Sequence, residues 1–219
     1  MSRLPTVALL LCAGLFANGA GAADREGWRR VPLTDAAERA ALGILDPERA
    51  VFAWQEPATP PRDAGIVPIG RDQASVLVMG SEFVGISASF VAGRTGFAEE
   101  LFCPASSLES RARARVPLPS DRRLRFLDVW GFDSSATRDL QVRLQEFCLP
   151  LGAASEGELT LVSTVSSSGA PGYFNLRFIL PPVWPATAAC SWFLQVDFAG
   201  CQAGDALRLS GARVLWDAP

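Results

Sequence analysis

An alternation of apolar and polar residues, with a period of two, constrains the fold of this chain more than any other feature. It is clearest at Leu140, Val142 and Leu144, where the intervening residues Gln141 and Arg143 are polar. Successive side chains of a β-strand point to opposite faces of a sheet, so this pattern indicates a strand that is buried on one face. Apolar residues alternate in the same way at 84–90, 174–180 and 192–198.

Turn sequences separate these segments and set the expected architecture. Pro119–Asp121, Asp133–Ser135 and Ser166–Gly169 combine residues that favour tight turns. No helical pattern stands between the alternating segments, which is typical of an antiparallel all-β domain of about eight strands. We therefore predict an all-β fold, an antiparallel β-sandwich or jelly roll, with strands at 138–148, 157–166, 172–180 and 190–199.

The segment from residue 23 to residue 64 has a different character. Asp35, with Glu38 three residues later, predicts the start of a short helix that extends to Leu45 and ends at Asp46–Pro47. Proline residues then become frequent up to Pro61. We expect residues 23–64 to form an N-terminal arm with a short helix and a Pro-rich linker, and residues 65–219 to form the β-sandwich domain.

The first 22 residues predict export from the cytoplasm. Arg3 precedes an apolar run at 7–16, and Ala20–Ala22 offers small residues at the cleavage positions of a secretory signal peptide. An apolar run of about ten residues is too short to cross the ~30 Å hydrocarbon layer of a membrane. Lipidation at Cys12 is disfavoured because Leu11 precedes it. We expect a periplasmic or extracellular protein that has no transmembrane segment after signal cleavage.

Cysteine usage agrees with this location. Removal of the signal leaves Cys103, Cys148, Cys190 and Cys201, and an even number of cysteines in an exported protein predicts two disulfides. Four free thiols, or a metal site made of four distant sulfurs, are the alternatives. If the four strands alternate in direction, Cys148 and Cys190 lie at the same end of the domain. Cys190 and Cys201 flank a strand and lie much farther apart than the ~6 Å that a disulfide spans. We therefore predict the pairs Cys148–Cys190 and Cys103–Cys201.

Two absences from the composition exclude several kinds of chemistry. The sequence contains no His and no Lys, so all 20 basic residues are Arg. Catalytic pairs that need His, metal sites with His ligands, Schiff bases and P-loop lysines are therefore excluded. The net charge of −3 argues against a nucleic-acid partner, which needs a clustered positive surface. The sequence predicts no cofactor and no bound metal.

The candidate functional residues include two carboxylates that flank a tryptophan. Asp128 and Asp133 lie on either side of Trp130, where a strand runs into a turn. Two carboxylates beside a tryptophan can form a glycosidase pair or a calcium and sugar site. The structural alternative is an Asp-capped turn beside a core tryptophan.

Exposed tryptophans are the second group of candidates, because the chain has six Trp residues and one Tyr. Aromatic faces on a sandwich can stack on sugar rings or anchor a protein partner. Trp192 continues the apolar face of its strand and is expected in the core. Trp184 lies between prolines in the sequence 181–185, which cannot easily bury it in a strand ladder, so it is the candidate contact residue.

A run of alternating arginines is the third candidate. Arg111, Arg113 and Arg115 have strand spacing, and Arg122, Arg123 and Arg125 follow. Such a face can bind an anionic polymer, for example lipopolysaccharide or a sulfated glycan, or it can simply be a solvated strand face.

The second half of the chain resembles uncharacterised exported bacterial β-sandwich proteins. The resemblance rests on Leu124–Asp133, Phe147–Pro150, Cys190–Phe198 and Leu207–Trp216. It implies a sandwich fold and an envelope or extracellular location, and it transfers no catalytic residue.

Taken together, these features predict an exported, disulfide-stapled, non-catalytic protein that binds a glycan or an envelope or secreted protein. The predicted contact residues are Trp184, Trp130, Asp128 and Asp133. A carboxylate-based hydrolase using Asp128 and Asp133, and a structural subunit of an extracellular assembly, are the alternatives.

The export hypothesis makes the first prediction. Because Ala20–Ala22 fits signal peptidase, the secreted protein should begin at Ala23 or Asp24. Intact-mass measurement of exported protein tests this expectation. A retained Met1, or a lipid on Cys12, would show that the segment is not a cleaved signal peptide.

Overall fold

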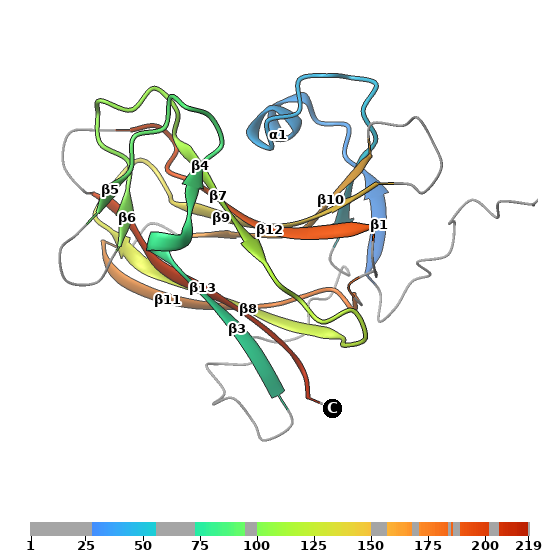
Figure 1. The fold of residues 1–219 in the computed structure, drawn as a ribbon. Helices are drawn as coiled ribbons and strands as arrows, with labels where there is room; N and C mark the ends of the chain where they lie inside the picture. The colour runs from blue at the N-terminus through green and yellow to red at the C-terminus, as the bar shows by residue number, and fades with distance from the viewer. Residues whose placement is uncertain are drawn as a thin grey trace, which may run out of the picture.

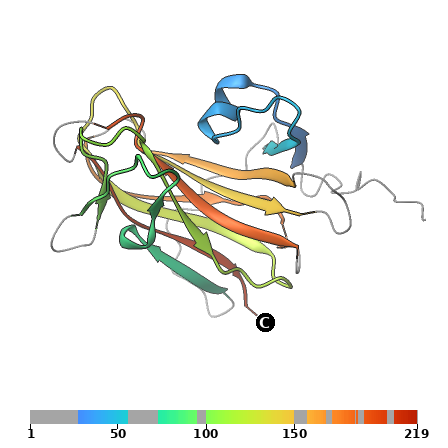
Figure 2. The same cartoon turned by 45° about the horizontal axis from the view of Figure 1, so that its top comes forward.

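The chain forms two β-sheets that lie one above the other, with a short α-helix on the outside of one of them (Figures 1 and 2). This computed structural model describes residues 28–55, 73–94, 100–149, 157–167, 171–183, 185, 189–201 and 206–218. The predicted signal peptide, most of the Pro-rich segment and Trp184 lie outside the described residues. The prediction of an all-β fold is confirmed at the level of fold class.

One sheet has seven strands, which are antiparallel to their neighbours except where β2 and β10 run parallel. Their order across the sheet is β1 (Arg29–Pro32), β2 (Val51–Gln55), β10 (Glu158–Ser166), β9 (Gln141–Cys148), β12 (Cys190–Asp197), β7 (Arg111–Val116) and β4 (Val84–Gly85).

The other sheet is antiparallel throughout its described pairs and has six strands. The order is β11 (Gly172–Ile179), β8 (Leu124–Asp133), β13 (Leu207–Asp217), β6 (Leu101–Phe102) and β5 (Gly93–Arg94), and β3 (Gln73–Met79) pairs with another part of β13. A short 3-10 helix, η1 (Gly80–Glu82), links β3 to β4.

The main hydrophobic core joins the inner faces of the two sheets. Val142 and Leu144 of β9 and Leu194 of β12 are completely buried there, together with Leu127 and Val129 of β8. These residues are the apolar members of the alternating pattern in their strands. The predicted strands at 138–148, 157–166, 172–180 and 190–199 therefore correspond to β9, β10, β11 and β12.

The pattern at 84–90 was wrongly interpreted as a strand. Only Val84 and Gly85 are extended, and Val84 is 68% exposed. The chain turns back beyond them, because the Phe90 amide donates a hydrogen bond to the Ser87 carbonyl oxygen. Phe90 packs so closely on Gly85 that a Cβ there would lie 2.4 Å from the Cβ of Phe90. The apolar spacing thus reflects a tight turn.

The N-terminal segment is part of the seven-stranded sheet. β1 pairs with β2, and β2 pairs with β10 through Val51 and Leu159. The helix α1 (Ala36–Ala41) lies between these strands in the sequence, and the Asp35 carboxylate accepts a hydrogen bond from the Glu38 amide. It ends before the predicted Leu45, because Gly43 adopts a left-handed φ of +80°.

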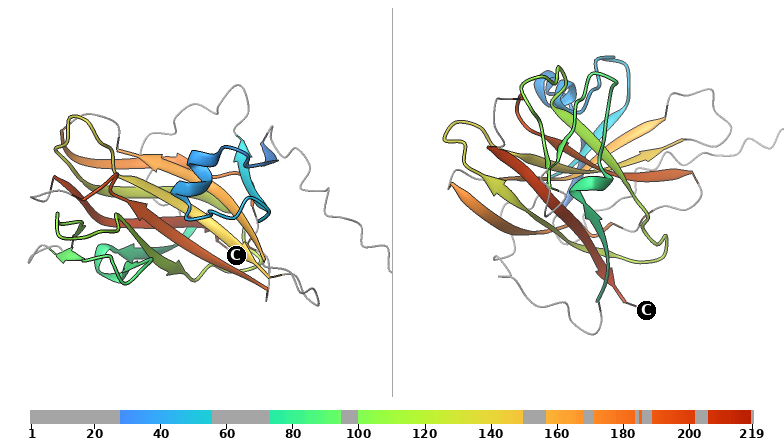
Figure 3. Two further views of the ribbon diagram at one scale, coloured as in Figure 1. Left: turned by 90° about the horizontal axis from the view of Figure 1, so that it is seen from above. Right: turned by 60° about the vertical axis from the view of Figure 1, so that its left-hand side comes forward.

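A small second core fixes α1 to the outer face of the seven-stranded sheet. Leu33 and Leu42 from the helical segment pack there on Val51 of β2 and Leu159 of β10. Both views in Figure 3 show α1 on the side of this sheet that faces away from the six-stranded sheet. The outer face of the seven-stranded sheet is therefore partly covered.

Both predicted disulfides are present. Cys148 and Cys190 are opposite each other on the antiparallel neighbours β9 and β12, with their Cα atoms 4.0 Å apart. Cys103 joins Cys201, with a Cα separation of 4.9 Å. Two disulfides suggest an oxidising compartment. Among the described residues, no helix has the length and apolar character that a membrane span requires.

The Cys148–Cys190 disulfide generates the second prediction. It closes a loop with a sequence separation of 42, so replacing both cysteines by Ala should lower the free energy of unfolding by about 2–4 kcal/mol. Chemical denaturation of the purified variant measures this loss, and non-reducing peptide mapping of the wild type checks the pairing. A peptide that joins Cys190 to Cys201 would contradict the register of β12.

Candidate binding surface

Asp128 lies on the outer face of the six-stranded sheet, where two arginines from the neighbouring strands hold it. Arg177 of β11 donates from Nε and Nη2 to the two carboxylate oxygens, at 2.6 and 2.8 Å. Arg213 of β13 donates from Nε and Nη2 to Oδ2, at 3.1 and 2.6 Å. The sheet register places both residues directly opposite Asp128. Bidentate pairs of this kind fix both charge and orientation.

These contacts also set the ionisation of Asp128. Burial by itself would raise the pKa of this carboxyl group, but the hydrogen bonds and charges of Arg177 and Arg213 outweigh burial and lower the pKa. The hydrogen bond to Asp128 raises the pKa of Arg177 in turn. Asp128 is therefore an ionised structural group at neutral pH, and the three residues together carry one net positive charge.

Asp133 points away from Asp128. The two residues are five positions apart along β8, so their side chains lie on opposite faces of the strand. Asp133 is 2% exposed and accepts hydrogen bonds from the Ser167 hydroxyl at 2.6 Å and from the Ser135 amide at 2.8 Å. The second bond is that of an Asp-capped turn, and the first joins β8 to the end of β10 in the other sheet. The structure therefore does not bring the two predicted carboxylates together.

Aromatic side chains share the outer face with Asp128. Trp130 and Phe132 follow it at strand spacing on β8, and Tyr173 of β11 lies opposite Phe132. We call this surface the aromatic–arginine face. Its residues are Asp128, Trp130 and Phe132 of β8, Tyr173, Asn175 and Arg177 of β11, Arg208 and Arg213 of β13, and Glu100 next to β6.

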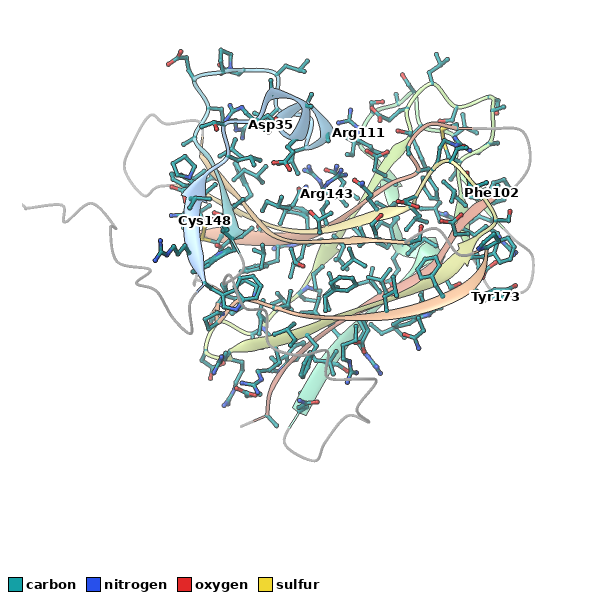
Figure 4. The ribbon with its side chains drawn as sticks, turned by 180° about the vertical axis from the view of Figure 1, so that it is seen from behind. Asp35, Phe102, Arg111, Arg143, Cys148 and Tyr173 are labelled. Carbon is teal, nitrogen blue, oxygen red and sulfur yellow. A yellow bond between two sulfur atoms is a disulfide. The ribbon has the colours of Figure 1, made fainter. Side chains whose placement is uncertain are left out.

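Tyr173 is 74% exposed, and its ring is held by two neighbours. Phe132 packs edge-on against it, with ring centroids 5.1 Å apart. The Arg208 guanidinium lies 4.2 Å from the Phe132 centroid and 5.6 Å from that of Tyr173, and its Nη2 donates to the Tyr173 hydroxyl at 3.4 Å. Figure 4 shows Tyr173 at the margin of the molecule, where β11 begins.

A buried carboxylate fixes Arg208 in this position. Glu100 is 4% exposed, and one of its oxygens lies 2.9 Å from Nη1 of Arg208. The other oxygen accepts a hydrogen bond from the Ser210 hydroxyl at 2.7 Å. The charged groups beneath Tyr173, Arg208 and Glu100, are therefore paired with each other, and the Tyr173 ring projects into solvent.

Trp130 forms the middle of the face and is half-buried. Its indole ring covers Gly211 of β13, where a Cβ would meet two ring atoms at 3.4 and 3.5 Å. The Arg213 guanidinium lies 5.9 Å from the ring. The predicted contact residues Trp130 and Asp128 thus lie on one surface, with Asp128 as its buried support.

Sequence analysis did not identify Tyr173 and Arg208. The sequence pattern could have identified Tyr173, because it alternates with the apolar residues of β11 that begin at Phe174. This position places its side chain on the outer face. The expected core position of Trp192 is confirmed, since it is 3% exposed.

The described residues contain one close group of three potential metal ligands, Glu146, Cys148 and Cys190. The two sulfurs form a disulfide, so they offer no thiolates to a metal ion. No family model matches the sequence, and no curated protein matches it either.

The Asp128 cluster generates the third prediction. Asp128→Asn should lower the free energy of unfolding by about 3 kcal/mol at pH 7, because two guanidinium groups lose a buried carboxylate. The folded pKa of Asp128 is lowered, so its contribution is complete above the pKa of an unfolded Asp, about 4, and is lost as the pH falls through the folded pKa. Denaturation at several pH values should therefore show the full difference at pH 7 and a shrinking one below pH ~4.

Asp217→Asn is the matched control on the same sheet. Asp217 is 3.5 Å from Arg125 and its side chain is 47% exposed, so its loss should cost less than about 1 kcal/mol. Equal losses in the two variants would refute the structural role of Asp128.

Proposed function

We propose that this protein is exported and acts by binding a glycan through the aromatic–arginine face, without catalysing a reaction. The observation that carries the proposal is Tyr173, a 74% exposed aromatic ring held in place by Phe132 and Arg208. Exposed aromatic rings with fixed orientation offer a flat apolar surface on which a sugar ring can stack. Because the ring is already ordered, binding costs less conformational entropy.

The polar residues around Tyr173 suit the hydroxyl groups of a sugar. Asn175 is exposed and neighbours Trp130 across the strand pair. Arg213 keeps a side chain that is 28% exposed while it holds Asp128. These groups provide hydrogen-bond donors and an acceptor next to an aromatic surface, the combination found in sites with few, well-placed polar groups.

The carboxylate positions favour binding over the alternative of a hydrolase. A glycosidase needs two carboxyl groups that face one substrate across a cleft. Asp128 is neutralised by two arginines, and Asp133 faces the interior between the sheets. A protein partner in place of a glycan, and a structural subunit of an assembly, remain the other candidates.

Two further features belong to the same proposal. We take the two sheets to form a β-sandwich of the jelly-roll type, related to uncharacterised exported bacterial sandwich proteins. We also take Met1–Ala22 to be a cleaved signal peptide, which places the protein in the periplasm or outside the cell. Trp184 stays a predicted contact residue.

The proposal predicts the effect of removing the exposed ring. Tyr173→Ala should weaken binding of an oligosaccharide identified on a glycan array by about tenfold or more, because the exposed aromatic ring is lost. Tyr173→Phe should retain most of the affinity, since it keeps the ring. Isothermal titration calorimetry measures all three proteins, and thermal unfolding verifies that they are folded.

Leu108→Ala provides the control, because Leu108 is 91% exposed and lies in the loop before β7, away from this face. Its affinity should equal that of the wild type. If Tyr173→Ala binds the same oligosaccharide as tightly as Leu108→Ala does, the aromatic–arginine face is not the binding surface.

A further inference from the structure

The three arginines of β7 lie in three different environments on the outer face of the seven-stranded sheet. Ala112 and Ala114 between them are buried in the main core. Arg111 forms a bidentate pair with Glu109 and also donates to the carbonyl oxygens of Ala40 and Ala41 at the end of α1. Arg115 is exposed, and Arg113 is partly buried between them. Of the three later arginines of the predicted patch, Arg125 belongs to the other sheet and pairs with Asp217.

Arg113 is held by two neutral side chains instead of a carboxylate. Its Nη2 donates to the side-chain oxygens of Gln145 at 3.4 Å and of Gln195 at 3.3 Å. Both glutamines are completely buried, which is unusual for this residue type. The guanidinium also lies 5.2 Å from the ring centroid of Phe193. These contacts orient the group and leave its charge uncompensated.

A chain of hydrogen bonds turns both glutamine oxygens towards Arg113. The Gln195 amide nitrogen donates to the Ala41 carbonyl oxygen at 2.9 Å, at the end of α1. The Gln145 amide nitrogen donates to the Gln195 oxygen at 3.2 Å. With both amide nitrogens engaged, the two oxygens are the groups that face the guanidinium. The helix thus helps to position Arg113 through Gln195.

The charge of Arg113 has no direct counterpart in the described part of the chain. No carboxylate there lies within 4 Å of it, and its buried Nε makes no hydrogen bond. Burial lowers the pKa of Arg113, and the positive charges of Arg111 and Arg49 lower it further. The protein therefore keeps a desolvated cation next to other cations, an arrangement that an anion would stabilise.

The neighbouring Arg143, unlike Arg113, lies close to a carboxylate. It is 7% exposed, and its Nη1 lies 3.6 Å from the Asp197 carboxylate without forming a hydrogen bond. Burial lowers the pKa of Arg143 although Asp197 opposes that change. Figure 4 shows Arg111 and Arg143 directed into the space between α1 and the loop that precedes β7.

We propose that Arg113 is the centre of a second binding site, which takes an oxyanion of an acidic ligand: a sulfate, phosphate or carboxylate group. Gln145, Gln195 and Phe193 hold the guanidinium in place through Nη2 and the ring contact, and Nη1 is the donor for the anion. Guanidinium groups form strong, charge-assisted hydrogen bonds with such oxygens. The site is on the opposite side of the molecule from the aromatic–arginine face, so it does not depend on the proposed glycan binding.

The first experiment uses inorganic sulfate as the probe and the full mature chain. The Nε–Hε resonances of the arginines are followed by NMR while sodium sulfate replaces sodium chloride at constant ionic strength. The Arg113 resonance should shift and saturate. Arg113→Gln should weaken sulfate binding by about tenfold or more, since a charged hydrogen-bonding partner is lost.

Two further variants separate this site from a general effect of surface charge. Arg115→Gln removes an exposed arginine two residues along the same strand face and should leave sulfate binding unchanged. Gln145→Glu keeps Arg113 and supplies the missing carboxylate, so it should suppress sulfate binding as strongly as Arg113→Gln does. Because Gln145→Glu retains the guanidinium, it tests the site even if Arg113→Gln fails to fold.

The chemical class of the bound anion is then determined with three short oligosaccharides, which carry sulfate, phosphate and uronate groups respectively. The ligand class that displaces inorganic sulfate from the wild type, and that itself no longer binds to Gln145→Glu, is the class that the site takes. Sulfate binding that is equal in the wild type and Gln145→Glu, or a sulfate response that never saturates, would overturn the proposal.

Discussion

The packing of the two inner sheet faces against each other determines where all other groups of the molecule can lie. Side chains such as Leu127, Val142 and Leu194 are completely buried between the sheets. Because side chains alternate along a strand, each buried residue places its neighbours on an outer face. The charged and aromatic residues of β8 and β7 are therefore concentrated on two opposite surfaces, and each surface is organised by pairs across neighbouring strands.

Arginine is the only basic residue available for those surfaces, and the structure uses its planar shape. One carboxylate, Asp128, satisfies two guanidinium groups, while Arg208 combines an ion pair to Glu100 with contacts to two aromatic rings. A lysine has a single point of charge and cannot make both kinds of contact at once. Arg113 contacts neutral glutamines instead of a carboxylate.

Sequence patterns predicted the parts of the fold that depend on local alternation. The strands β9 and β12, and hence the Cys148–Cys190 pair, followed from the period of two and from strand direction. The odd spacing of Asp128 and Asp133 already implied opposite faces, although both were taken as one candidate site. Other features depend on the register between distant strands, which the sequence does not display. The parallel pairing of β2 with β10 and the approach of Arg208 to Tyr173 are of this kind.

The parallel pair β2–β10 has a consequence for the order in which the chain can assemble. Val51 lies opposite Leu159, so the partner of an early strand is synthesised only after about half of the chain has followed it. Until β10 is synthesised, β2 lacks its parallel partner strand. The small apolar cluster of the N-terminal segment also lacks Leu159. Contacts between such distant segments form only after a long loop has closed. The chain entropy lost in closing that loop slows folding. The N-terminal segment can therefore join the sheet through β10 only after most of the chain has been synthesised.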